Sequence, residues 1–97
     1  MLKSVEKLVG ATDRNEMKVG NHGMFRSISH SLENDDEIEE IRYFTYHGNI
    51  IARVNDLKRT AFLTNAGWNT SSTNRALNDY KRYFTAAGYE VHDSREK

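Results

Sequence analysis

The stretch that decides the fold spans residues 41–88 and opens with Ile41-Arg42-Tyr43-Phe44-Thr45-Tyr46-His47-Gly48-Asn49-Ile50-Ile51-Ala52-Arg53. Residues 41–46 and 50–54 are rich in β-branched and aromatic residues, which favour strands. Between these two runs, His47-Gly48-Asn49 predicts a tight turn. A second turn at residues 55–58 and a third strand at residues 59–64 extend the hairpin into an antiparallel meander.

A helix is predicted to follow the meander over residues 73–87. Several side chains suited to an N-cap precede it, in the run Asn69-Thr70-Ser71-Ser72-Thr73. Apolar residues then recur at helical spacing, at Ala76, Leu77, Tyr80, Phe84 and Ala87. Gly88 suits the left-handed position just after a helix, and residues 89–91 are a candidate edge strand.

The first forty residues carry weaker patterns. Leu2, Val5, Leu8 and Val9 stand at helical spacing, which predicts a short helix ended by Gly10. Residues 11–23 are polar and rich in turn formers, which predicts a loop. Residues 24–32 fit a helix and a strand equally well, so both assignments stay open.

Together these patterns predict an α+β fold. We expect a three- to four-stranded antiparallel β-sheet covered by one main C-terminal helix, with a short N-terminal helix in addition. A chain of 97 residues has room for a single domain. Within it we expect residues 41–92 to form the core, and residues 1–40 to be an extension that packs on a sheet edge or on the open face of the sheet.

Composition removes several classes of function. The chain has no cysteine, which excludes disulfides, a thiol nucleophile and thiolate metal sites. Basic and acidic residues number 14 each, so no overall field favours nucleic acid or an acidic membrane. No run approaches the ~20 apolar residues that a membrane helix needs, and we expect a cytoplasmic protein without a membrane partner.

Acidic residues are concentrated just before the meander. Six of them occur without an intervening base: Glu33, Asp35, Asp36, Glu37, Glu39 and Glu40. Clustered carboxylates imitate nucleic-acid phosphates, so this run is a candidate contact with a basic groove on a host protein. The alternative interpretation is a solvated loop, because most charge runs face water.

Basic residues accumulate on the meander and at the start of the predicted helix. The candidate nucleic-acid-binding residues are Arg42, Arg53, Arg59, Trp68, Ser72, Asn74 and Arg75. Cations beside stacking rings suit single-stranded nucleic acid, and a helix N-terminus suits anions. The alternative interpretation assigns most of the rings to the core and the polar helix start to capping.

Catalytic and metal motifs are missing from the sequence. The histidines His22, His30, His47 and His92 are scattered, without the spacing of metal ligands. No nucleophile elbow, phosphate loop or dinucleotide fingerprint occurs. We therefore predict no enzyme activity, no catalytic residue, no metal site and no cofactor.

Residues 42–52, 64–68 and 70–78 together resemble a family of small bacteriophage and prophage proteins, in which a hairpin leads to a Gly-Trp step and a capped helix. The resemblance covers residues 41–88. The family has no established biochemical role, so the resemblance implies only a context, namely a small protein acting inside an infected bacterium. The leading prediction is a non-enzymatic phage accessory protein that binds and inhibits a host protein, as anti-CRISPR and other anti-defence inhibitors do. The alternative is a small nucleic-acid-binding protein.

Overall fold

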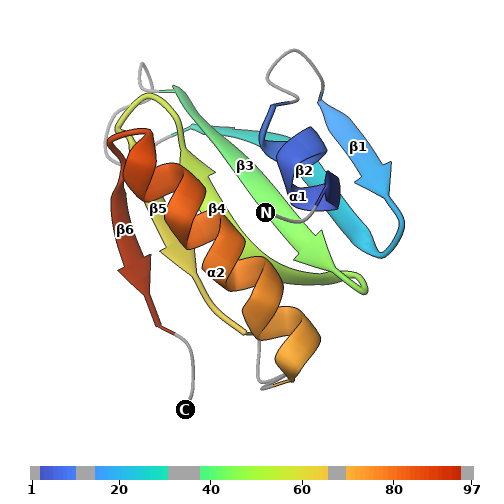
Figure 1. Cartoon of the computed structure of the whole chain (residues 1–97). Helices are drawn as coiled ribbons and strands as arrows, with labels where there is room; N and C mark the ends of the chain where they lie inside the picture. Colours follow the sequence, from blue (N-terminus) through green and yellow to red (C-terminus); the bar gives the residue numbers. More distant parts are fainter. Residues whose placement is uncertain (1–2, 11–14, 31–37, 66–69, 95–97) are drawn as a thin grey trace.

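The computed structural model describes residues 3–10, 15–30, 38–65 and 70–94, and these form two layers (Figure 1). One layer is a six-stranded sheet, and the other consists of two helices that lie on the same face of that sheet. The elements in chain order are α1 (Lys3–Val9), β1 (Glu16–Val19), β2 (His22–His30), β3 (Ile38–Tyr46), β4 (Asn49–Asn55), β5 (Thr60–Leu63), α2 (Ser71–Ala86) and β6 (Glu90–Asp93).

The sheet is larger than predicted and it is mixed. Its strands lie in the order β1-β2-β3-β4-β5-β6, antiparallel from β1 to β5, whereas β6 runs parallel to β5. The expectation of a three- to four-stranded antiparallel sheet is therefore wrong. The three strands of the meander are present as β3, β4 and β5, and the additional strands come from both ends of the chain.

The N-terminal hairpin accounts for two of the additional strands. Val19 pairs with His22, so β1 and β2 are joined by a two-residue turn at Gly20 and Asn21. Gly20 has φ +62°, as the first central residue of a type II′ turn requires. The loop prediction for residues 11–23 is wrong at residues 16–19 and 22–23, which are strands, because the turn formers hide the short alternating pattern of β1; residues 11–14 lie outside the described residues. The strand assignment is the correct one for β2, which pairs along its whole length with β3.

The direction of β6 follows from the helix that precedes it. A helix laid along the sheet carries the chain back to the end where β5 began, so the next strand runs parallel to β5. The candidate edge strand at residues 89–91 is observed at residues 90–93, but it is parallel rather than antiparallel.

The core lies between the two layers. Among the described residues, fourteen buried apolar ones form it, namely Val5, Leu8, Val9, Met24, Phe44, Ile51, Ala52, Val54, Ala61, Leu63, Ala76, Leu77, Tyr80 and Phe84. The predicted N-terminal helix is confirmed as α1, but it packs beside α2 on the covered face instead of on an edge or the open face. Three core residues come from α1, so this short helix completes the layer that α2 alone leaves incomplete.

The caps of α2 agree with the sequence, although the helix spans Ser71–Ala86 instead of residues 73–87. The Thr70 Oγ1 atom accepts a hydrogen bond from the backbone N–H of Thr73 at 3.3 Å, which makes Thr70 the N-cap. At the other end Gly88 adopts φ +87°, and the N–H of Tyr89 donates to the carbonyl of Phe84 at 2.9 Å. This pairing is a Schellman motif, and it confirms Gly88 as the residue that ends the helix.

Candidate nucleic-acid interface

The face of the sheet opposite the helices, which we call the open face, carries one row of side chains in register across five strands. Phe25 pairs with Tyr43, Tyr43 with Arg53, Arg53 with Phe62, and Phe62 with His92. Residues paired across strands point to the same side of the sheet. These five residues therefore form a continuous row, which we call the stacking ladder.

Ring geometry shows that the ladder is built from two stacked pairs. Phe25 and Tyr43 stack with centroids 4.9 Å apart and planes 18° apart. Phe62 and His92 stack with centroids 4.8 Å apart and planes 13° apart. Between the pairs, the Arg53 guanidinium lies over the Phe62 ring, with Cζ 5.7 Å from the centroid. The ladder thus joins ring faces and a cation in one line.

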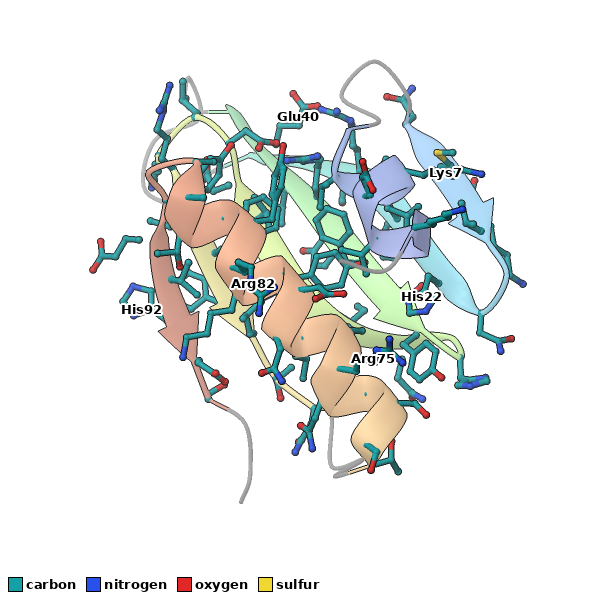
Figure 2. All side chains as sticks on the ribbon, viewed as in Figure 1. Lys7, His22, Glu40, Arg75, Arg82 and His92 are labelled. Carbon is teal, nitrogen blue, oxygen red and sulfur yellow. The ribbon has the colours of Figure 1, made fainter. Side chains whose placement is uncertain are left out.

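The ladder is accessible to a ligand. Phe62 is 44% exposed, and Arg53 and His92 are exposed as well, while Phe25 and Tyr43 are half-buried. Figure 2 places His92 at the free edge formed by β6, away from α2. A row of apolar rings left facing solvent is typical of an interaction surface.

A hollow of about 420 Å³ opens beside the middle of the ladder. Its volume lies within the ~300–1,000 Å³ that is usual for ligand sites. Its lining combines rings, amide, hydroxyl and cationic groups, from Ile41, Tyr43, Arg53, Asn55, Lys58, Thr60 and Phe62. Stacking groups and hydrogen-bonding groups therefore meet over β3, β4 and β5.

On the open face, two cations lie near the centre and carboxylates lie at both edges of the sheet. Arg53 and Lys58 stand beside the hollow, whereas Glu16 pairs with Phe25 at the β1 edge and Glu90 lies at the β6 edge. The Glu90 carboxylate is 3.3 Å from Nε2 of His92. The two cations beside the hollow thus lie between carboxylates at the two edges of the sheet, and the exposed Lys18 adds a cation beside Glu16 at the β1 edge.

Arg42 corrects one of the predicted nucleic-acid contacts. Its side chain is buried beneath the helices. There its Nε and Nη2 atoms donate hydrogen bonds to the Asp56 carboxylate at 2.7 and 2.8 Å. The same guanidinium donates to the carbonyl of Val9 and lies 5.4 Å from the Phe44 centroid. Arg42 is therefore a buried link between α1 and the sheet, and no phosphate reaches it.

The other predicted cations are not gathered with Arg53. Arg59 is exposed in the turn before β5, and Arg75 is exposed on α2, which lies against the opposite face of the sheet (Figure 2). Ser72 is exposed and Asn74 is half-buried at the start of the same helix. Trp68 lies outside the described residues. The start of α2 is therefore a different surface of the molecule from the open face that carries Arg53.

A second hollow of about 500 Å³ adjoins that helix start. It lies between the β3–β4 hairpin and α2, and its lining includes Tyr46, His47, Asn65, Thr70 and Ser72. Residues 66–69, between Asn65 and Thr70, lie outside the described part of the chain. The candidate site is the stacking ladder, because stacked rings, a guanidinium and a hollow occur together there.

The acidic run is described only at its end. Glu33, Asp35, Asp36 and Glu37 lie outside the described residues, and for Glu39 only the strand position is described, opposite Ser29. The Glu40 carboxylate accepts a hydrogen bond from Nη1 of Arg26 at 2.8 Å, and its side chain is 51% exposed. Of the predicted protein-binding residues, Glu40 is therefore the one with a described environment.

The histidines do not form a metal site in the described part of the chain. No group of three His, Asp or Glu side chains there is placed to hold a metal ion. His22 stacks on Tyr46 with centroids 4.7 Å apart, and its Nδ1 atom is buried without a hydrogen-bond partner among the described residues. Burial, and secondarily the nearby His47, lowers the pKa of His22. His22 therefore packs as an aromatic ring.

Comparison with known proteins adds no relative. No protein-family model, curated protein or solved structure matches the chain. Within the described residues, neither helix has the length and apolar character needed to cross a membrane.

Proposed function

We propose that the protein binds single-stranded nucleic acid on its open face. The observation that carries the proposal is the stacking ladder, in which four rings and one guanidinium stand in register across five strands. A sheet face that presents rings and cations in a line is the arrangement that single-stranded nucleic acid uses.

Stacking makes the ladder selective for unpaired bases. Each base that stacks on an aromatic side chain contributes about 1–3 kcal/mol, with little dependence on its identity. In a duplex the base faces are covered by their neighbours, so the rings of the ladder gain little from it. The proposal therefore predicts that a single strand binds more tightly than the duplex of the same sequence.

Electrostatic attraction contributes less than stacking. The chain has no net charge, and the open face places two cations, Arg53 and Lys58, beside the hollow. Each phosphate neutralised on a single strand adds about −0.7 to the slope of log K against log salt. Two contacts predict a slope of about −1.4, which is shallow for a nucleic-acid-binding protein.

Fluorescence anisotropy with a labelled single strand and its duplex tests the proposal. We expect Phe62→Ala to weaken single-strand binding by about 1–3 kcal/mol, because it removes the ring that holds Arg53 and His92 in line within the ladder. Ile50→Ala is the matched control, because Ile50 is 40% exposed on the same face but pairs with Thr45, outside the ladder. Equal losses in the two variants, or no binding by the wild-type protein at low salt, would contradict the proposal.

Inhibition of a host protein is the second candidate function, with a phage-encoded protein in the bacterial cytoplasm as its setting. The supporting observation is the half-exposed carboxylate of Glu40 at the described end of the acidic run. Reversal of Glu37, Glu39 and Glu40 to lysine should then abolish capture of the partner from a host extract. The same reversal should leave single-strand binding intact, whereas Phe62→Ala should leave partner capture intact. The two functions are thus separable by two variants.

A further inference from the structure

The stacking ladder ends at β6 in a side chain that can change its charge. His92 pairs with Phe62, and the two rings stack with centroids 4.8 Å apart and planes 13° apart. The side chain of His92 is 47% exposed, so solvent and a ligand both reach it. An accessible imidazole ordinarily changes its charge between about pH 8 and about pH 5. The row of side chains that would face a nucleic acid therefore contains one member whose charge depends on pH.

A neighbouring carboxylate determines which ring nitrogen takes up the proton. The Oε1 atom of Glu90 is 3.3 Å from Nε2 of His92, and the two residues stand two positions apart on the same face of β6. A carboxylate at this position favours the neutral tautomer that carries its proton on Nε2. The additional proton is then taken up at Nδ1, the nitrogen that does not face Glu90. Protonation thus gives His92 a second, charged N–H donor, which suits a phosphate oxygen.

The groups around His92 accommodate a positive charge. On its β5 side the ring faces Phe62, and a cation is attracted to the face of an aromatic ring. The Arg53 guanidinium lies on the β4 side of Phe62, and two strand spacings of about 4.8 Å place β4 about 9.6 Å from β6. This separation is close to the Debye length at 0.1 M salt, so the repulsion from Arg53 is largely screened. Where α2 meets β6, the Lys81 ammonium is 3.5 Å from the Asp93 carboxylate, and this pair adds no net charge.

We infer that His92 is a titratable phosphate contact, through which the protein binds a single strand more tightly in mildly acidic solution. With the imidazole neutral, Glu90 leaves the β6 edge of the open face negative, and a phosphate is repelled there. With the imidazole protonated, the pair has no net charge and His92 offers a donor. The inference rests on the proposed single-strand binding and deepens it, because it adds regulation by pH at one end of the ladder.

Anisotropy of a labelled single strand at about pH 7.5 and about pH 5.5 tests the inference. We expect the affinity of the wild-type protein at 0.1 M salt to rise about fivefold in acid, which is the effect of one added phosphate contact with a slope of about 0.7 between 1 M and 0.1 M salt. In His92→Phe a ring is kept beside Phe62 but nothing titrates, so the gain should disappear. His47→Asn is the matched control and should keep the gain. His47 is exposed in the β3–β4 turn, away from the ladder, and its φ of +50° is one that asparagine tolerates.

Two measurements on the wild-type protein keep the test independent of how His92→Phe folds. The slope of log K against log salt should become steeper by about 0.7 at the lower pH. Calorimetry in two buffers of different ionisation enthalpy should show that binding takes up protons, which a purely packing role of His92 would not produce. An unchanged slope, no proton uptake, or an equal gain in a folded His92→Phe would overturn the inference. Each of these results would leave the proposed function standing if Phe62→Ala still weakens binding near pH 7.5, whereas absence of binding at both pH values would remove both.

Discussion

The two faces of β3 carry neighbouring aromatic residues in opposite circumstances. Phe44 points to the helices, is fully buried and has the rings of Tyr80 and Phe84 at 4.8 and 5.9 Å. Tyr43 points to the open face, is half-buried and stacks on Phe25 within the sheet layer. Rings on the covered face are enclosed from above by helices, whereas rings on the open face touch mainly their neighbours in the row. One face therefore supplies stability, and the other is left able to exchange solvent for a ligand.

Truncating one ring on each face should produce the largest difference. We expect Phe44→Ala to lower the free energy of unfolding by about 3–5 kcal/mol, because it leaves a cavity in a closed core. Phe62→Ala should lower it by less than about 1 kcal/mol, since surface substitutions cost little. Urea denaturation followed by circular dichroism measures both changes. Similar losses would show that the open face contributes to the core after all.

The buried ion pair beneath the helices gives a second, smaller asymmetry. The Arg42 side chain is 3% exposed, whereas that of Asp56 is 38% exposed. Removing Asp56 leaves a buried, unpaired guanidinium and also removes the acceptor of the Tyr89 hydroxyl, which donates to Oδ1 at 2.7 Å. Removing Arg42 leaves a carboxylate that water reaches.

We therefore expect Asp56→Ala to destabilise the fold by about 3 kcal/mol, as breaking a buried pair does. Arg42→Met, which keeps much of the volume of the arginine, should cost about 1 kcal/mol, because partly solvated pairs contribute little. The same urea series compares the two variants. An equal or larger loss in Arg42→Met would contradict this account of the pair.

These contrasts also show which features could be read from the sequence. The caps and apolar stripe of α2 and the tight turn at His47 and Gly48 are local, and the structure confirms them. The stripe differs at one position, Ala87, which is exposed. The hairpin of β1 and β2 and the parallel β6 depend on pairing between distant segments, which a single sequence does not display.

The ladder could be predicted only in part for the same reason, since Arg53 is among the predicted nucleic-acid-binding residues but its alignment with four rings depends on strand pairing. Apolar residues precede and follow Phe62, so alternation could not decide which face its ring takes. Phe25 and His92 lay in segments without a firm strand assignment, and register alone brings them into line with Tyr43 and Phe62. The burial of Arg42 could not be predicted either, because a charged residue is rarely buried without a partner and its partner Asp56 is 14 residues away along the chain.

A hydroxyl inside the core offers a milder change on the covered face. The Tyr80 hydroxyl is buried and makes no hydrogen bond to the described residues. Burial, and secondarily the charge of Asp79, raises the pKa of Tyr80. We expect Tyr80→Phe to stabilise the protein by about 1 kcal/mol at neutral pH, because it removes an unsatisfied polar group.

The effect of Tyr80→Phe should grow in alkali. Because the pKa of the Tyr80 hydroxyl is raised in the folded state, the folded protein keeps this proton at a pH where the unfolded chain loses it. The stability that follows from this difference is fully present below pH 10 and is lost as the pH rises above 10. The wild-type protein should therefore lose stability above pH 10 more steeply than Tyr80→Phe. Tyr83→Phe is the matched control, because Tyr83 lies at the edge of the same helix and is only partly buried. Melting temperatures at neutral pH and above pH 10 provide the comparison.

The smallest expected effect is that of a substitution on the open face. It changes the salt dependence of nucleic-acid binding and leaves the stability of the protein unchanged. Lys58 is exposed beside the hollow, so Lys58→Ala should leave the free energy of unfolding within about 0.5 kcal/mol of the wild-type value. If its ammonium group neutralises one phosphate, the slope of log K against log salt should become shallower by about 0.7. Lys7→Ala is the control, since Lys7 is exposed on α1, across the molecule on the covered side (Figure 2), and should leave the slope unchanged. The same change of slope in both variants would mean that the nucleic acid is attracted by cations on the whole surface. The open face would then have no special role in binding, contrary to the contrast between the two faces of β3.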